Sequence, residues 1–181
     1  MRPSQKFRLA LLCLLSLVCT TPVALAEAPP VAVASRGHRL PIAWPAGQDP
    51  ARAVVRPADI PEHNWEPGHR GVDLRATPGQ EIRASRGGRV HFAGVVAGTP
   101  VVSIVHPGGV KTTYEPVVAS VVTGSPVRRG QVLGTLADPA TLPEHTRKPQ
   151  GLSWGARLLD AEGRYVDPMS LLGGLQVRLL E

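Results

Sequence analysis

Prolines and glycines, nineteen of each in 181 residues, divide this chain into short segments. The prolines are densest in residues 38–68, which contain six of them. Each proline lacks a backbone N–H donor and fixes φ, so this stretch cannot form a central strand or a long helix. We therefore expect residues 38–68 to wrap around a core formed by later residues, held in place by Trp44 and Trp65.

From His69 onward, short runs of alternating or β-branched residues stand between turn residues. The turn at residues 107–109 predicts a hairpin, and Asp167 followed by Pro168 predicts the N-cap of one helical turn. This spacing is typical of an all-β barrel or sandwich, so we predict a mostly β domain of small antiparallel sheets. The predicted strands are 81–84, 88–94, 101–106, 110–114, 117–122, 132–136 and 154–159.

The first 26 residues have the pattern of a secretory signal peptide. Three basic residues precede an apolar run over 9–18, and the small residues 24–26 form the expected cleavage site. A membrane anchor is the alternative, but the apolar run is shorter than the roughly 20 residues that span a bilayer. A lipoprotein is a weaker alternative, because bulky Val18 precedes Cys19. The sequence thus predicts secretion to the cell envelope.

The remaining chain is expected to consist of four parts. A flexible leader covers 27–37, and the proline-rich wrapping segment covers 38–68. The β domain follows over 69–172, and a C-terminal tail covers 173–181.

Charge and cysteine content narrow the chemistry that the mature chain can perform. The formal charge is +6, and removal of the three basic residues in the signal lowers it to +3. Such a mild excess does not imply nucleic-acid binding. Both cysteines lie in the signal, which excludes a disulfide, a cysteine nucleophile and cysteine-bound zinc from the mature protein. Any metal would have to be held by His, Asp or Glu.

The segment 67–74 contains a His-x-x-x-Asp motif, formed by His69 and Asp73. This segment and those that follow it resemble, in the same order, the M23 (LytM, lysostaphin-type) metallopeptidases. The resemblance covers about Trp44 to Leu172. The further matching segments are 87–94, 105–109, 112–114, 130–134, 154–157 and 165–168.

The resemblance implies a small antiparallel β domain crossed by a groove that binds peptidoglycan stem or cross-link peptides. It also implies zinc, held by the His and Asp of the first motif and by the second His of a later His-x-His. Here those first two ligands would be His69 and Asp73. Hydrolytic zinc needs three protein ligands, an open position for water, and a base that accepts the proton of that water.

This chain departs from the family pattern at three positions. By the match, Ser153 stands in place of the third metal ligand, and Gly151 stands in place of the catalytic histidine. Pro116 stands where another histidine is often found after the hairpin tyrosine. Two ligands and a neutral hydroxyl predict low zinc occupancy. Glu115, as a base, and His145, as a replacement ligand from a polar loop, are the remaining candidates.

Three functions follow from these residues. The first is a catalytically degenerate M23-like domain that binds peptidoglycan or regulates another cell-wall hydrolase. The second is a working zinc endopeptidase that cleaves cross-link peptides with an unusual ligand set. The third is a biotinyl- or lipoyl-like carrier, suggested by residues 127–134, although no lysine lies at a suitable turn tip. We favour the first.

Overall fold

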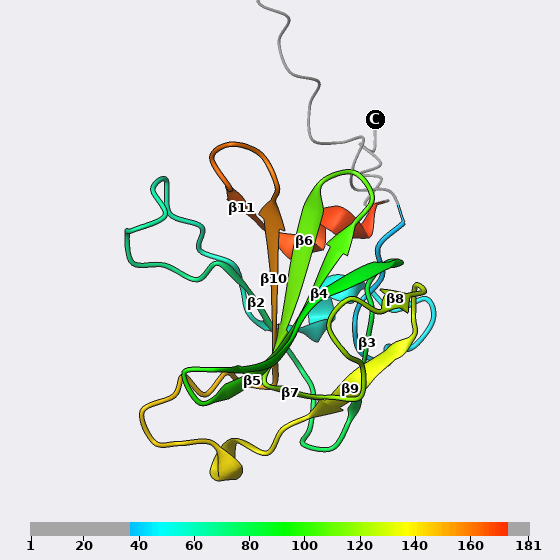
Figure 1. The fold of residues 1–181 in the computed structure, drawn as a ribbon, viewed down its shortest axis with the longest axis vertical. Helices are drawn as coiled ribbons and strands as arrows, with labels where there is room; N and C mark the ends of the chain where they lie inside the picture. Colours follow the sequence, from blue (N-terminus) through cyan, green and yellow to red (C-terminus); the bar gives the residue numbers. More distant parts are fainter. Residues whose placement is uncertain (1–36, 174–181) are drawn as a thin grey trace, which may run out of the picture.

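A computed structural model describes residues 37–173 of this chain. The predicted signal peptide, nearly all of the predicted leader, and residues 174–181 of the predicted tail lie outside the described residues. Strands dominate the described part, and its helical segments are short 3-10 turns (Figure 1). None of the helices within 37–173 has the length and apolar character needed to cross a membrane.

One large antiparallel sheet carries most of the structure (Figure 1). Its strand order is β1-β2-β10-β6-β5-β4-β8, and β11 pairs with the free end of β10. Strands β4, β5 and β6 form consecutive hairpins, and the turn at 107–109 predicts the second of them, β5 with β6. The bounds are β1 Val54–Arg56, β2 Gly71–Leu74, β4 Gly88–Val96, β5 Thr99–His106, β6 Val110–Glu115, β8 Pro126–Val127, β10 Leu152–Leu158 and β11 Tyr165–Val166.

A smaller sheet, ordered β3-β9-β7, completes the domain. Its strands are β3 Glu81–Arg83, β9 Val132–Leu136 and β7 Val117–Ala119. The core lies where residues of the two sheets meet and includes the fully buried side chains of Trp154, Tyr114, Leu74, Ile82 and Leu133. The prediction of a mostly β, antiparallel fold is confirmed.

The proline-rich segment wraps the sheet as its composition predicts. Leu40 and Ile42 are buried in the core, and the chain then forms the 3-10 turn η2 (Pro50–Ala53) and the edge strand β1. Trp44 packs against the core as expected. The expectation for Trp65 is wrong, because its side chain is 81% exposed and stacks on the ring of His63 instead.

The predicted strands and the predicted helical turn are present. The structure also contains strands that the pattern did not identify: β1 in the proline-rich segment, and β2, β8 and β11 in the β domain. Asp167 caps the 3-10 turn η4 (Pro168–Leu172) by accepting a hydrogen bond from the Met169 amide. A third 3-10 turn, η3 (Pro139–Thr141), lies in the long loop between β9 and β10.

Alternation along three adjacent strands positions the candidate site. In β6 and β10, every second side chain packs into the core, and the residues between them face the other side of the sheet. Lys111, Thr113 and Glu115 therefore share a face with Ser153 and Arg157. The His69–Asp73 motif lies at the start of β2, which pairs with β10 on its other side.

Candidate functional site

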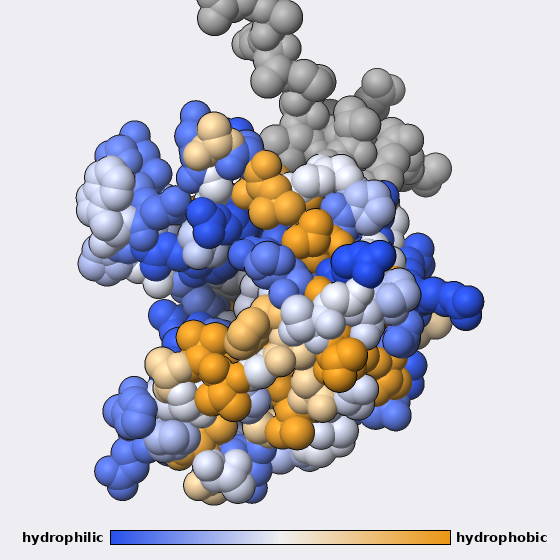
Figure 2. All heavy atoms as spheres, viewed as in Figure 1, coloured by the Kyte–Doolittle hydropathy of each residue, from blue (hydrophilic) through white to orange (hydrophobic). Residues whose placement is uncertain are grey.

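A groove of about 500 Å³ lies on this face of the sheet, above β2, β10 and β6. One wall comes from the loop before β2 and the other includes Arg147, from the long loop between β9 and β10. Figure 2 shows a hollow between the lobes that contain these two loops, with hydrophilic side chains gathered around it. Five basic side chains and one acidic side chain line the groove: Arg56, Arg70, Lys111, Arg147, Arg157 and Glu115.

His69 and Asp73 meet at one end of the groove, and both are buried. The Nδ1 atom of His69 lies 2.7 Å from the Pro57 carbonyl oxygen, which can only accept a hydrogen bond. Nδ1 therefore carries the proton, and the lone pair of Nε2 faces the site. Nε2 lies 3.2 Å from Oδ1 of Asp73. The orientation of the imidazole is the one that a metal ligand or a hydrogen-bond acceptor needs.

Ser153 lies between the two carboxylates of this end of the groove. In the sheet it pairs with Asp73 of β2 on one side and with Glu115 of β6 on the other. The sequence match placed Ser153 at the position of a third metal ligand, and the structure brings it beside Asp73, 4% exposed. Its hydroxyl is neutral, whereas the protein groups that bind zinc are imidazole, thiolate and carboxylate groups.

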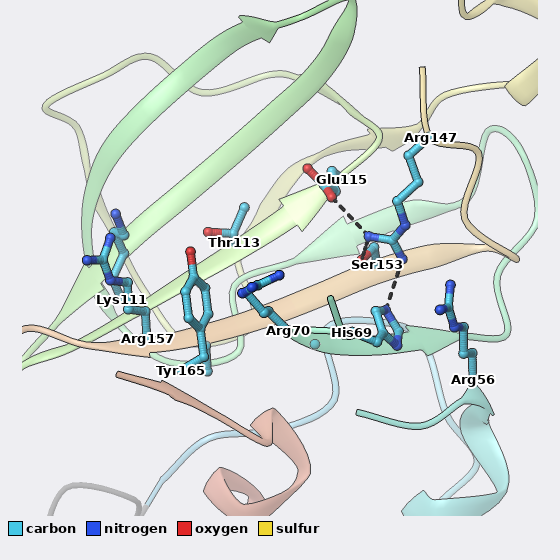
Figure 3. Close-up of a pocket in the computed structure, with 14 residues that line it drawn as sticks. Arg56, His69, Arg70, Lys111, Thr113, Glu115, Arg147, Ser153, Arg157 and Tyr165 are labelled. Atoms are coloured by element: carbon cyan, nitrogen blue, oxygen red, sulfur yellow. Dashed lines mark hydrogen bonds and ion pairs between the residues drawn. The ribbon is translucent and has the colours of Figure 1, made fainter. Parts of the chain in front are cut away.

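Arg147 fills the space between these side chains, and sequence reasoning missed it. Its Nη2 donates to Oδ1 of Asp73 at 2.8 Å and to Nε2 of His69 at 2.9 Å. Its Nη1 lies 3.3 Å from Oγ of Ser153 and 3.5 Å from Oε1 of Glu115 (Figure 3). The guanidinium thus binds the imidazole lone pair and a carboxylate oxygen, which are the two atoms that a metal ion would need as ligands.

The residues present do not fit a zinc ion. Within residues 37–173, no three His, Cys, Asp or Glu side chains are arranged to hold a metal. His69 and Asp73 are the two available ligand residues, and Arg147 binds both of them. An arginine side chain stays protonated in proteins, so this positive charge is permanent. The resemblance implied zinc, and the geometry of this site disagrees with it.

The backbone at Gly151 is also unsuited to the histidine that the family pattern would place there. Gly151 has φ +106°, a conformation that side-chain-bearing residues rarely adopt. A Cβ at this position would lie 2.2 Å from the Leu74 carbonyl oxygen. The backbone path at Gly151 therefore leaves no room for a side chain. Pro116 directly follows Glu115, and its carbonyl accepts a hydrogen bond from the Ala137 amide.

The two candidate residues from sequence reasoning have different positions. Glu115 lies in the groove, where burial raises the pKa of its carboxyl group and the nearby Arg147 opposes this shift. His145 is exposed in the long loop and borders a neighbouring hollow formed mainly by β4, β5 and β6. The structure does not bring His145 to His69 and Asp73, so it does not complete a ligand set; Arg147, two residues later, reaches the site instead.

A hydrogen-bonded network runs beneath the opposite face of the same strands. The Tyr114 hydroxyl lies 2.9 Å from Oγ of Ser85 and 2.8 Å from that of Thr112. Oγ of Ser85 is 2.9 Å from Nδ1 of His38, and Oγ1 of Thr112 is 2.7 Å from Nε2 of His106. Burial lowers the pKa of His38 to about 3, and it also lowers the pKa of His106. These groups stabilise the fold and do not reach the groove.

Comparison with known proteins identifies the scaffold. Residues 67–168 match Peptidase family M23. The chain belongs to this family. An uncharacterized protein of Mycobacterium tuberculosis (strain H37Rv) is 48% identical to this M23 chain over 139 residues, which cover 76% of the chain and 54% of the relative. An uncharacterized protein of Mycobacterium bovis matches to the same extent. The chain thus spans about half the length of the curated relatives it matches.

Solved structures show the same fold. Helicobacter pylori Csd3 superposes with a TM-score of 0.54 at 23% identity, covering 76% of this M23 chain and 33% of Csd3. A zinc-containing peptidase from Vibrio cholerae has a TM-score of 0.53 at 20% identity, with coverage of 73% and 40%. Lysostaphin has a TM-score of 0.53 at 18% identity, with coverage of 76% and 54%. At these identities the likeness concerns the fold.

Proposed function

We propose that this protein is a non-hydrolytic M23 domain that binds peptidoglycan peptides at the cell envelope. The observation that carries the proposal is the position of the Arg147 guanidinium, which donates to both Asp73 and His69. Hydrolysis in this family depends on a metal. In this site the Arg147 guanidinium binds His69 and Asp73, the residues that the metal would need as ligands. The groove itself remains open above β2, β10 and β6, so binding without cleavage is the function that its geometry supports.

Three departures act together at one end of the groove. Ser153 offers a hydroxyl in place of a third ligand, Gly151 has no room for a side chain, and Arg147 occupies the two donors that remain. Each alone would weaken a metal site. Their coincidence supports a site that has been converted from metal binding to an ion-paired, metal-free arrangement.

The proposal also includes a location, the cell envelope, and a partner, another cell-wall hydrolase. The signal-peptide pattern of residues 1–26 supports secretion to the envelope, where peptidoglycan is found. Another cell-wall hydrolase is the partner that such a domain would regulate, by presenting or withholding peptides from it.

The first experiment measures zinc content and hydrolysis on the same sample. The purified protein is incubated with zinc, dialysed, assayed for bound metal, and then mixed with purified peptidoglycan while newly released amines are counted. We expect less than stoichiometric zinc and no amine release. Stoichiometric zinc, with an amine release that His69→Ala abolishes, would establish the zinc endopeptidase instead. That alternative is favoured by one observation, the retained contact between His69 Nε2 and Asp73 at 3.2 Å.

A second experiment restores the missing donor. Ser153→His alone should still bind little zinc, because Arg147 continues to occupy His69 and Asp73. The double variant Arg147→Ala/Ser153→His removes the guanidinium and supplies a third imidazole, so it should hold zinc at close to one equivalent. Arg147→Ala alone is the matched control and should remain poor in zinc. If Ser153→His alone binds zinc as well as the double variant, Arg147 does not block the site.

A further inference from the structure

The end of the groove away from Arg147 contains three cations gathered around Tyr165. The guanidinium carbons of Arg70 and Arg157 lie 5.7 Å and 5.6 Å from the centre of the Tyr165 ring. Lys111 of β6 pairs directly with Arg157 of β10, which in turn pairs with Tyr165 of β11. Figure 3 shows Lys111, Arg157 and Tyr165 at one end of the groove, with Arg70 between Tyr165 and His69. We call this group, Arg70, Lys111 and Arg157, the cation cluster.

The cation cluster has no acidic partner within residues 37–173. The ion pairs of this part of the chain all involve other basic residues. Arg70 donates to the carbonyl oxygens of Asn64 and Glu66, and Arg157 donates to that of Gly163. These contacts orient the two guanidinium groups but leave their charge uncompensated. Two of the three charges lie on the adjacent strands β6 and β10, and Arg70 lies in the loop before β2. These like charges repel one another, and a bound anion would relieve that repulsion.

The opposite end of the groove is electrostatically different. There Arg147 pairs with Asp73 and Glu115, and Arg56 lies opposite Asp73 in the sheet. Two positive charges thus meet two negative charges, and this end has no excess of positive charge to attract an anion. Ser153 and Arg157 are four residues apart on β10, which places the two ends roughly 13 Å from each other. The groove therefore has one cationic end and one compensated end, and a ligand would bind in one direction.

Small residues form the floor between the two ends. Gly155 of β10 lies in register between Gly71 of β2 and Thr113 of β6. No long side chain rises from this row, so an extended main chain can lie close to the sheet. Along β10, Gly155 separates the cation cluster from Ser153, so the floor has the length of a short extended segment. A peptide of a few residues can cover this length, whereas a compact ion covers only one end.

We propose that the cation cluster binds a carboxylate of an extended acidic peptide whose chain continues over Gly155 toward Ser153. This deepens the proposed function, on which it rests, by naming the chemical class of the peptide and its direction in the groove. Arg70 and Arg157 supply guanidinium forks, and Lys111 supplies a point charge; both types bind carboxylates through charge-assisted hydrogen bonds.

The test compares two probe peptides by NMR titration of the isotopically labelled protein in the presence of EDTA. The probes are acetyl-Gly-Gly-Gly-Glu-amide and acetyl-Gly-Gly-Gly-Gln-amide, which differ by one charge. We expect the Glu peptide to bind about tenfold more tightly, with shifts confined to β6, β10, β11 and the loop that carries Arg70, and a preference that fades as salt is raised. Equal binding of the two peptides, or no binding of either, overturns the proposal.

Variants locate the effect. Lys111→Gln/Arg157→Gln should abolish the preference for the Glu peptide. Arg89→Gln/Arg128→Gln removes the same charge from exposed positions outside the groove and should leave the preference intact. An equal loss in both variants would indicate general attraction by net charge, which contradicts a specific cluster. If the first variant does not fold, the comparison of the two peptides on the unaltered protein still decides the question.

A titration with inorganic phosphate tests whether the cation cluster binds a phosphate group instead of a peptide carboxylate. If inorganic phosphate binds at the cluster while the two peptides bind equally, the site holds a phosphate group and the peptide proposal is wrong. The metal-free conditions keep this experiment separate from the zinc and hydrolysis assays. A Glu preference alongside zinc-dependent hydrolysis would refute only the non-hydrolytic function, whereas loss of the preference with no hydrolysis would refute only the acidic-peptide proposal.

Discussion

The two faces of strands β6 and β10 differ sharply in what their side chains contact. Toward the core they place Tyr114 and Trp154, both fully buried, next to the polar network around Thr112. Toward the groove, the neighbouring residues Glu115 and Ser153 are bridged by Arg147. Residues adjacent in sequence therefore pack into the core on one side of the sheet and line the groove on the other.

This difference shows that separate residues of the same strands specify the fold and the chemistry of the groove. Core side chains must fill a fixed volume at high packing density, so a family scaffold persists. Groove side chains contact mainly one another and Arg147, so they can differ without changing the packing of the core. The following predictions, from the largest expected effect to the smallest, measure how independent the two faces are.

Replacing the buried indole should have the largest effect. Trp154→Ala leaves a cavity in the core and should lower the free energy of unfolding by about 3–5 kcal/mol. Urea denaturation followed by circular dichroism measures the change. A loss below about 1 kcal/mol would mean that the core face does not carry the stability assigned to it.

Introducing a side chain at Gly151 should come next. Gly151→Ala forces a Cβ to 2.2 Å from the Leu74 carbonyl oxygen at φ +106°, and we expect a loss of about 2–4 kcal/mol. Gly79→Ala is the matched control, because Gly79 has φ +80° with open space around its Cβ position. It should lose only about 1 kcal/mol, so equal losses would show that strain alone, and not the clash, governs both positions.

Acid should destabilise the core face through His38. Burial, assisted by the neighbouring charges of His106, Arg86 and Arg129, lowers the pKa of His38 from 6.5 to about 3. Between these values the unfolded chain takes up a proton that the folded chain does not, so stability falls as pH falls. The slope from this group approaches about 1.4 kcal/mol per pH unit. His38→Asn should flatten the dependence measured by urea denaturation from pH 7 to pH 4, whereas exposed His91→Asn should not.

Removing the internal cation should have a moderate effect. Arg147→Met leaves buried Asp73 without its guanidinium partner, and we expect a loss of about 1–3 kcal/mol. The value is below that of a fully buried pair because the Arg147 side chain is 44% exposed. Arg164→Met, which breaks a surface pair with Asp160, should leave the urea midpoint unchanged. A stabilised Arg147→Met protein would contradict the role of the guanidinium.

Replacing the hydroxyl on the groove face should have the smallest effect. Ser153→Ala removes only a 3.3 Å contact with Arg147 and should change stability by no more than about 1 kcal/mol. Compared with Trp154→Ala one residue away, it gives the contrast between the two faces directly. Similar losses at both positions would erase that contrast.

Much of the fold could be predicted because it depends on local patterns. The glycine-bounded runs indicated most strands, and Asp167-Pro168 indicated the helical turn that the structure contains. Strands β1 and β2 were not identified, since β1 lies in the proline-rich segment and β2 is a four-residue strand that carries the His-x-x-x-Asp motif. Trp65 was misplaced because hydrophobicity does not show which tryptophan of a loop reaches the core.

The candidate site divides in the same way. His69, Asp73 and the departures at Gly151 and Ser153 could be read from the chain because motif spacing and order place them. Arg147 gave no local signal, as it is one of many basic residues and lies in a polar loop. His145 was the more natural candidate for its chemistry, yet the loop directs the residue two positions later into the site.

The sequence by itself determined most of the strands and the family, because both depend on residue type and order. Only the tertiary structure decided which side chain lies between His69, Asp73 and Ser153. The contact of Arg147 with Asp73 joins residues 74 positions apart, and that with His69 joins residues 78 positions apart. Their pairing depends on how a long loop packs over a sheet. The same packing gathers Arg70, Lys111 and Arg157 from three segments into one cluster, which no pattern within any one segment encodes.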